Sequence, residues 1–266
     1  MPNSIVVVRE VWDTRDLVGS VVDGGRIKES MLTTRFEPED LNALEMALRI
    51  KDKHGGTVRA VSLGEPRQVD VLRECLYRGV DGVMRVADPL FEGLDTMATA
   101  YVLSEAIRRM GDFDLILCGV DVVEGENSML AGHIAGFLRL PLVTYVDDFE
   151  SVSGEGIVCK RAVEMGYEYV EVKFPAVLSV GVALLKDDPR APRSARAALK
   201  LKHKRTPIPT WSASDLGIGS LEELRTASIE GYEPVPERVI ETKEVDPEDE
   251  SALKAMLDEI LSGIKG

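Results

Sequence analysis

The chain has 266 residues, of which 44% are hydrophobic and 29% charged, and its formal net charge is −14. These values are typical of a folded globular protein, and the net negative charge speaks against general binding to nucleic acid. No run reaches the roughly 18 apolar residues that a membrane span needs, and the start of the chain lacks the pattern of a signal peptide. We therefore expect a cytoplasmic protein with no direct membrane span.

The first part of the chain alternates between short apolar runs rich in β-branched residues and longer amphipathic runs. The short runs predict strands at residues 4–8, 57–63, 82–86, 113–118 and 142–146. The amphipathic runs predict helices at residues 38–54, 66–78, 95–110 and 127–138. Strands that alternate with helices favour an α/β fold, in which a doubly wound, mostly parallel sheet carries helices on both faces.

The pattern changes after residue 146. Residues 147–174 hold short runs separated by Gly turns, and Tyr167–Phe174 alternates with period two, which predicts an antiparallel hairpin added to the sheet. Residues 175–181 are typical of one more buried strand. We expect residues 1–186 to form an α/β nucleotide-binding domain and residues 187–266 to form a docking segment and a long C-terminal arm that ends in an amphipathic helix.

Residues 190–205, called the basic segment below, carry four arginines, three lysines and no acid in an otherwise acidic chain. Such a stretch is either a solvated arm or a docking element for an acidic partner surface. The arm that follows has little core of its own, so it is expected to lie along a partner or across its own domain.

The stretch from Phe113 to Gly136 bears most directly on function. It reads as a buried strand, a Gly-containing loop and the first turns of a helix, and the N–H groups at a helix start can hold a phosphate without any cationic side chain. The loop carries Asp121, Glu124 and Glu126 and no basic residue. The main chain must therefore hold any phosphate that binds there.

Other chemistry has little support in the sequence. The three cysteines are far apart and show no CxxC spacing, and the three histidines are scattered. No HExxH motif and no Ser-His-Asp grouping is visible. We expect no catalytic residue and no metal site.

Several short stretches match one known family in the same order. They begin at Pro38 (Pro-Glu-Asp-Leu-Asn-Ala-Leu-Glu), Val61 (Val-Ser-Leu-Gly-Glu-Pro), Leu72 (Leu-Arg-Glu-Cys-Leu), Phe91 (Phe-Glu-Gly-Leu-Asp-Thr-Met-Ala-Thr), Asp114 (Asp-Leu-Ile-Leu-Cys-Gly), Asp188 (Asp-Pro-Arg), Lys200 and Trp211 (Trp-Ser-Ala-Ser-Asp-Leu-Gly). To about Gly217, the chain resembles the beta subunit of electron transfer flavoproteins, including the nitrogen-fixation-associated and bifurcating bacterial branch.

The resemblance implies a heterodimer with an electron transfer flavoprotein alpha subunit, which holds the main FAD. Such proteins pass electrons between a dehydrogenase, often of the acyl-CoA type, and another acceptor, and the dehydrogenase is expected to dock through residues 187–205. The beta subunit holds structural AMP at its own sheet edge or, in electron-bifurcating members, a second FAD that accepts a hydride from NADH. The Asp95-Thr-Met-Ala-Thr motif resembles the bacterial and bifurcating forms, which favours FAD.

The resemblance also places the nucleotide site at the ends of strands. Its residues are Val8, Arg9, Glu10, Val11, Glu37, Ser62, Leu63, Gly64, Gly119, Asp121, Val122, Val123, Gly125, Asn127, Ser128, Met129 and Leu130. Three positions depart from the family pattern, because Glu37, Asn127 and Met129 stand where the family usually has Asn, Thr and Gln. A degenerate loop with an altered or absent nucleotide is the alternative. The family's aliphatic docking residue is either missing or displaced to Leu199.

Two other functions fit the same residues. One is a non-redox scaffold that binds AMP and orients the FAD domain of the alpha subunit. The other is a stand-alone nucleotide sensor, which the apolar residues of the C-terminal arm argue against because they would be left uncovered in a monomer.

Overall fold

The computed structural model describes residues 1–13, 15, 21–28, 30, 32–64, 68–120, 128–181, 193–228, 230–231, 233, 244–246 and 248–264. The chain divides into two compact units, Met1–Tyr232 and Glu233–Gly266. The first unit holds the sheet and its covering helices. The second contains helix α7 (Glu250–Ile264). The boundary expected at residue 186 stays a prediction, although residues 193–228 contribute strand β13 and several contacts to the first unit.

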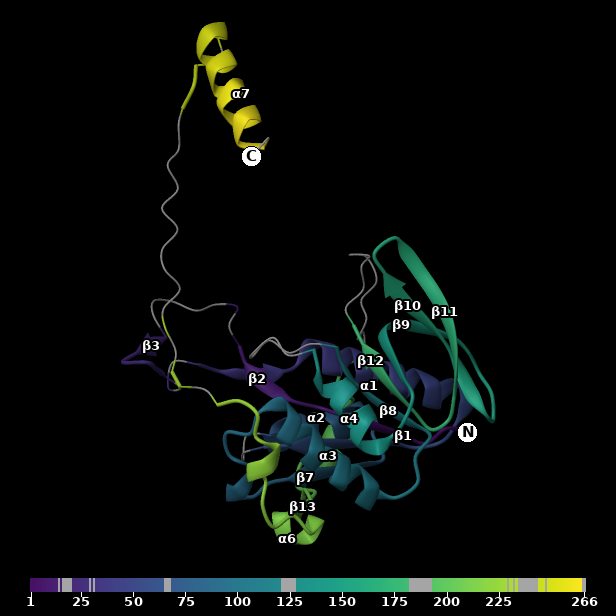
Figure 1. Ribbon diagram of the computed structural model, residues 1–266. Helices are drawn as coiled ribbons and strands as arrows, with labels where there is room; N and C mark the ends of the chain where they lie inside the picture. Colours follow the sequence, from purple (N-terminus) through teal and green to yellow (C-terminus); the bar gives the residue numbers. More distant parts are fainter. Residues whose placement is uncertain are drawn as a thin grey trace. The chain divides into compact units, whose positions relative to one another are not determined.

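In the described part of the chain, nine strands form one sheet in the order β11-β10-β9-β12-β8-β1-β6-β7-β13 (Figure 1). Their bounds are β1 Ser4–Val7, β6 Val58–Leu63, β7 Gly82–Val86, β8 Leu115–Gly119, β9 Leu142–Val152, β10 Gly156–Val163, β11 Gly166–Lys173, β12 Ala176–Val180 and β13 Thr210–Trp211. The seven neighbouring strands β9, β12, β8, β1, β6, β7 and β13 pair in parallel. Strand β10 pairs antiparallel with both β9 and β11. The predicted α/β fold, with a mostly parallel sheet and an added antiparallel hairpin, is confirmed.

Helices cover both faces of the sheet. Their bounds are α1 Pro38–His54, α2 Gln68–Arg78, α3 Thr96–Met110 and α4 Leu130–Leu138. Side chains of β1 alternate between the faces, so Val6 and Val8 pack with α1 and α2 while Ile5 and Val7 pack with α3 and α4. A strand that is buried on both faces needs mostly apolar residues, and β1 is apolar at every position except the buried Ser4.

The ends of α1 and α3 follow from local sequence. Pro38 stands in the first turn of α1, where a missing N–H costs nothing. Asp95 caps α3 by accepting the N–H of Ala98 at 2.9 Å, and Gly111 ends that helix with φ +82°. These ends agree with the helices predicted at residues 38–54 and 95–110.

Strand β9 differs from the prediction. The sequence pattern suggested a strand at residues 142–146 and a separate antiparallel strand after it, but one continuous strand runs from Leu142 to Val152. Its first part pairs in parallel with β12, and its second part pairs antiparallel with β10. Tyr145 has φ +54°, a backbone conformation that marks the bend between the two parts. The pattern of apolar residues therefore changes after residue 146 because β9 changes its neighbouring strand, and not because the strand ends there.

Short elements complete the first unit. They are the ribbon pairs β2 (Glu10–Trp12) with β5 (Thr34–Phe36) and β3 (Val22–Asp23) with β4 (Arg26–Ile27), together with helices α5 (Ala197–His203) and α6 (Ala213–Leu216) and the 3-10 turns η2 (Pro89–Phe91) and η3 (Glu222–Leu224). Among the helices that the structure describes, none has the length and apolar character needed to cross a membrane.

Candidate nucleotide site

The connections that follow the neighbouring strands β1 and β8 pass over opposite faces of the sheet. After β1 the chain passes through α1 on one face to reach β6, whereas after β8 it passes to α4 on the other face. β1 and β8 are neighbours in the sheet, and Val6 lies opposite Leu117. In open α/β sheets, ligands bind beyond the carboxyl ends of two such strands. The candidate site is therefore the edge at which Val8, Arg9 and Gly119 meet.

Arg9 and Asp40 form the central ion pair of this edge. Arg9 Nε lies 2.8 Å from Asp40 Oδ2, and Arg9 Nη2 lies 2.8 Å from Asp40 Oδ1, so the contact uses both carboxylate oxygens. The Asp40 side chain is 0% exposed and that of Arg9 is 18% exposed. Burial alone would lower the pKa of Arg9, but the charge and hydrogen bonds of Asp40 outweigh it and raise that pKa. The guanidinium is committed to this carboxylate.

Gly119 brings the end of β8 against the first turn of α1. Its main-chain N–H donates to Asp40 Oδ1 at 2.8 Å. A Cβ atom at position 119 would lie 2.7 Å from Glu39 Cβ and 3.0 Å from the Asp40 main-chain nitrogen. Helix α1 can approach this closely only because residue 119 has no side chain. One carboxylate thus joins the exits of β1 and β8.

Two further acids are buried at this edge, and the charge of Glu37 acts on Arg9. Glu37 is buried, and its main-chain N–H donates to the Arg9 carbonyl at 3.0 Å. Glu10 is also buried, and the Thr34 hydroxyl donates to its carboxylate. The acids around Arg9 outnumber it, so side-chain charge does not favour an anion here. An anion at this edge would depend on main-chain N–H groups.

The start of α4 offers such groups. Ser128 and Met129 are exposed, and the helix begins at the buried Leu130. Met129 stands at the N-cap and has no side-chain oxygen with which to cap the first turn. The N–H groups of a first turn carry partial positive charge and suit a phosphate. The other loop residues expected in the site, Asp121, Val122, Val123, Gly125 and Asn127, lie outside the described residues.

The remaining expected residues take structural positions. Ser62 is fully buried in β6, and the neighbouring Leu63 is aligned with Val86 of β7. The Gly64 N–H donates to the Val86 carbonyl at 3.0 Å, so β7 already uses it. Val11 is buried and aligned with Arg35 in the β2–β5 ribbon. These residues support the edge, whereas Arg9 and Gly119 both contact Asp40.

Asp40 was not among the expected site residues. A signal for it was present, because Asp40 lies in the stretch from Pro38 that carries the family resemblance. As an acid in the first turn of a predicted helix, it resembled one more residue favoured by the helix dipole. Only the three-dimensional arrangement shows that it reaches both Arg9 and Gly119.

The described residues of this edge give no support for thiol or metal chemistry. Cys118 is fully buried directly before Gly119, and burial together with the charge of Asp40 raises its thiol pKa to about 12, despite the opposing effect of Arg9. Within the described ranges, no three His, Cys, Asp or Glu side chains are grouped so that they could hold a metal ion.

Comparison with known proteins agrees with this architecture. The electron transfer flavoprotein domain model matches residues 25–216, which is more than half of the chain. The chain belongs to the electron transfer flavoprotein family. It is 34% identical over 215 residues to the caffeyl-CoA reductase-Etf complex subunit CarD of Acetobacterium woodii, covering 80% of this chain and 79% of that protein.

Two other family relatives are similar over much of the length. The electron transfer flavoprotein subunit beta of Thermoanaerobacterium thermosaccharolyticum is 39% identical over 178 residues, covering 66% of this chain and 67% of that protein. Protein FixA of Azorhizobium caulinodans is 29% identical over 241 residues, covering 88% and 83%. The resemblance to the electron transfer flavoprotein beta subunit is confirmed. The family match includes Asp40 and Gly119 but begins after Arg9.

Proposed function

We propose that this chain is the beta subunit of a heterodimeric electron transfer flavoprotein and binds FAD at the edge where β1 and β8 end. The observation that carries the proposal is the junction of Arg9, Asp40 and Gly119 at the switch point of the sheet. It fixes two strand exits and the first turn of α1 as a rigid wall of that edge. An adenine nucleotide is the ligand that such an edge commonly accepts.

The electrostatics define how the phosphates would be held. Arg9 is already paired with Asp40, and Glu37 adds negative charge near it. The phosphates would therefore bind main-chain N–H groups at residues 128–130, on the start of α4. The protein would supply placement and field, and the isoalloxazine of FAD would supply the redox chemistry. No residue of this chain is assigned an acid, base or nucleophile role.

The electron route follows from the relatives. The names of two of them refer to a caffeyl-CoA reductase complex and to an acryloyl-CoA reductase. By extension, we propose an acyl-CoA dehydrogenase or another dehydrogenase as electron partner for this chain, docked through residues 187–205. NADH is the proposed source of the hydride if the second FAD supports bifurcation.

The described part of the basic segment is suited to docking. On and after α5, Leu201 is 83% exposed and is surrounded in sequence by Lys200, Lys202 and Lys204, which are also exposed. Leu199, which was considered as the displaced docking residue, is only partly exposed and faces Gly79 of the chain itself. Leu201 is the better candidate for an aliphatic contact with an acidic partner surface.

The alternative is a scaffold subunit that binds structural AMP and orients the FAD domain of the alpha subunit. The same edge and the same N–H groups would hold AMP, so the wall geometry fits both ligands. The two functions are separated by purifying the complex with the alpha subunit and counting both nucleotides. Two FAD and no AMP per heterodimer support the redox subunit, whereas one FAD and one AMP support the scaffold.

A further inference from the structure

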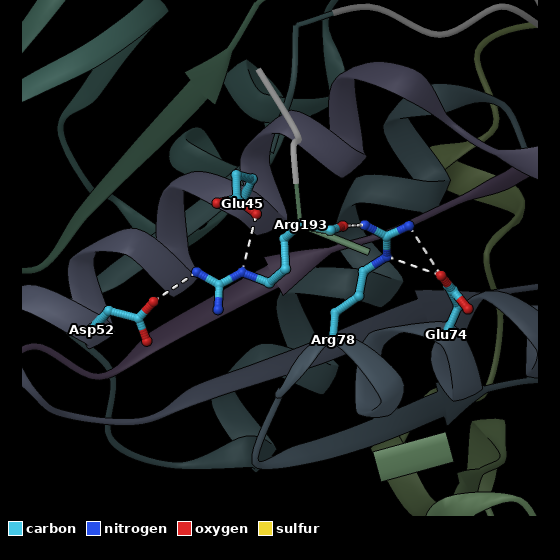
Figure 2. A network of polar contacts seen from close by, with 5 residues as sticks. All are labelled: Glu45, Asp52, Glu74, Arg78 and Arg193. Atoms are coloured by element: carbon cyan, nitrogen blue, oxygen red, sulfur yellow. Dashed lines mark hydrogen bonds and ion pairs between the residues drawn. The ribbon is translucent and has the colours of Figure 1, made fainter. Parts of the chain in front are cut away.

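Arg193, at the start of the described part of the basic segment, points into the molecule rather than toward a partner. Its Nε lies 3.2 Å from Glu45 Oε2, and its Nη2 lies 2.7 Å from Asp52 Oδ2, so it bridges two turns of α1 (Figure 2). The Arg193 side chain is 14% exposed and that of Glu45 is 6% exposed. Glu45 and Asp52 of the same chain therefore neutralise the charge of Arg193.

The main chain of the same segment is held by α2. Arg78 donates to the Arg193 carbonyl and is itself oriented by Glu74, whose Oε1 lies 3.0 Å from Arg78 Nη2 (Figure 2). The Arg196 N–H donates to the carbonyl of Tyr77 at 2.9 Å. Two arginines and one main-chain bond therefore fix residues 193–196 on α1 and α2.

The far end of the segment is also fixed. Arg73 Nη1 donates to the carbonyls of His203, Lys204 and Thr206 at 3.1, 3.0 and 3.2 Å. A single guanidinium thus holds the C-terminal end of α5, where carbonyls have no helical partner. Because both ends are fixed on α2, the exposed cations of α5 are presented from a defined position.

A cation that is partly buried between two carboxylates adds little to binding of an acidic partner. It loses hydration, and its charge is neutralised before any partner arrives. The contribution of Arg193 must therefore be geometric. Glu45 and Asp52 lie on α1, the helix whose first turn carries Asp40. One helix connects the attachment of the basic segment with the wall of the candidate nucleotide site.

We propose that Arg193 is a positioning residue that anchors the basic segment to α1, so that its exposed cations meet a partner dehydrogenase in one orientation. This inference rests on the proposed docking function of residues 187–205. Glu45 and Asp52 take part as the acceptors of the anchor.

Two substitutions that change the net charge in opposite directions distinguish anchoring by Arg193 from a general effect of charge on binding. Arg193→Gln removes a positive charge and Asp52→Asn removes a negative one, but each removes an ion pair of the anchor. We expect both variants to weaken binding of the heterodimer to its dehydrogenase by about tenfold or more, mainly through faster dissociation. If binding depended on charge alone, Asp52→Asn would leave it unchanged or strengthen it.

Matched controls separate anchoring from lost charge. Arg139→Gln makes the same charge change on an exposed side chain outside the basic segment, and Asp70→Asn removes an exposed acid of α2. We expect less than a threefold effect from either. Equal weakening by Arg193→Gln and Arg139→Gln, or tighter binding with Asp52→Asn, would overturn the anchor.

Hydrogen exchange of the heterodimer tests the anchor without any partner. Arg193→Gln should speed exchange of the Arg196, Lys200 and Lys204 amides, which are hydrogen-bonded in the anchored segment, whereas Arg196→Gln should leave the Lys200 and Lys204 amides protected. Unchanged protection in Arg193→Gln overturns the anchor. Failure of the wild-type heterodimer to bind any dehydrogenase would instead count against the proposed docking function, and the exchange result would still decide the anchor.

Discussion

The Asp40 carboxylate accepts the main-chain N–H of Gly119 at 2.8 Å, although the two residues lie on different elements and 79 positions apart. The same carboxylate pairs with Arg9. The first turn of α1 is therefore fixed to the exits of two neighbouring strands.

Replacing Gly119 with Ala should destabilise the fold. The added carbon would lie 2.7 Å from Glu39 Cβ and 3.0 Å from main-chain nitrogen of Asp40, so α1 must shift. We expect a loss of about 1–3 kcal/mol in the free energy of unfolding, measured by urea denaturation. Gly136→Ala is the control, since nothing lies within 4 Å of a Cβ there. It should be neutral or stabilising by roughly 0.5–1 kcal/mol. Equal stability of both variants would contradict the close approach.

Replacing Asp40 with Asn should cost about 3 kcal/mol in the free energy of unfolding. Asn retains an oxygen that can accept the Gly119 N–H, but Arg9 loses the charge that compensates its burial. Adding Arg9→Met to this variant should recover part of the loss, because it removes the uncompensated charge. A double-mutant cycle measures the coupling. Additive effects of the two substitutions would show that the ion pair contributes little.

Asp95 should make stability depend on pH. Burial alone would raise its pKa, but hydrogen bonds donated by Ala98, Thr226 and Ala227 lower it to about 2. A lowered folded-state pKa means that the stabilisation is complete above the ordinary pKa of about 4 and is lost as the pH falls toward 2. Asp95→Asn should therefore be less stable than wild type at pH 7, by about 0.5–1 kcal/mol. The difference should shrink in urea titrations between pH 5 and pH 3, and a constant difference would contradict this role.

The three thiols should be unreactive in the folded protein. Cys75, Cys118 and Cys159 are buried and free. Burial raises the pKa of Cys159 to about 12, and burial and the Asp40 charge do the same for Cys118. We expect no rapid reaction with a disulfide reagent at pH 8 and three equivalents after unfolding in urea. A thiol that reacts rapidly in the native protein would show that one of these sites opens.

Helix α7 should contribute to heterodimer formation. Its Leu257, Ile260 and Leu261 are each at least 50% exposed and recur at helical spacing. If this face packs on the alpha subunit, Leu257→Asp should lower heterodimer affinity by tenfold or more, measured by analytical ultracentrifugation. Met165→Asp is the matched control, since Met165 is also exposed but lies at the β10–β11 turn. An equal effect of the two changes would exclude a specific role for α7.

Most of the long helices and strands could be predicted from the sequence, but a strand that changes its neighbour and the shortest elements could not. Helix α1 occupies the predicted residues because Pro38 and Gly55 mark its ends and its apolar residues follow one face. β9 was divided wrongly, since a strand that changes neighbours at Tyr145 also changes its side-chain pattern. The two-residue strand β13 and the short helix α5 carry too little pattern to predict, and contacts with β7 and α2 determine them.

The candidate site was predicted as a set of strand ends but without the residue that joins them. Val8, Arg9 and Gly119 follow strands that periodicity and resemblance identify. The bond from Gly119 to Asp40 depends on α1 lying against β8, a relationship between distant residues that no local pattern contains. Asp121, Val122, Val123, Gly125 and Asn127 stay predictions, because they lie outside the described residues.

The most direct measurement is an experimental density map of the purified heterodimer at the edge where β1 and β8 end. We predict an adenosine group beside Arg9 and Gly119, with its phosphates contacting main-chain N–H groups at residues 128–130. An edge filled by protein atoms with no nucleotide, or phosphates held mainly by Lys and Arg side chains, would contradict the account.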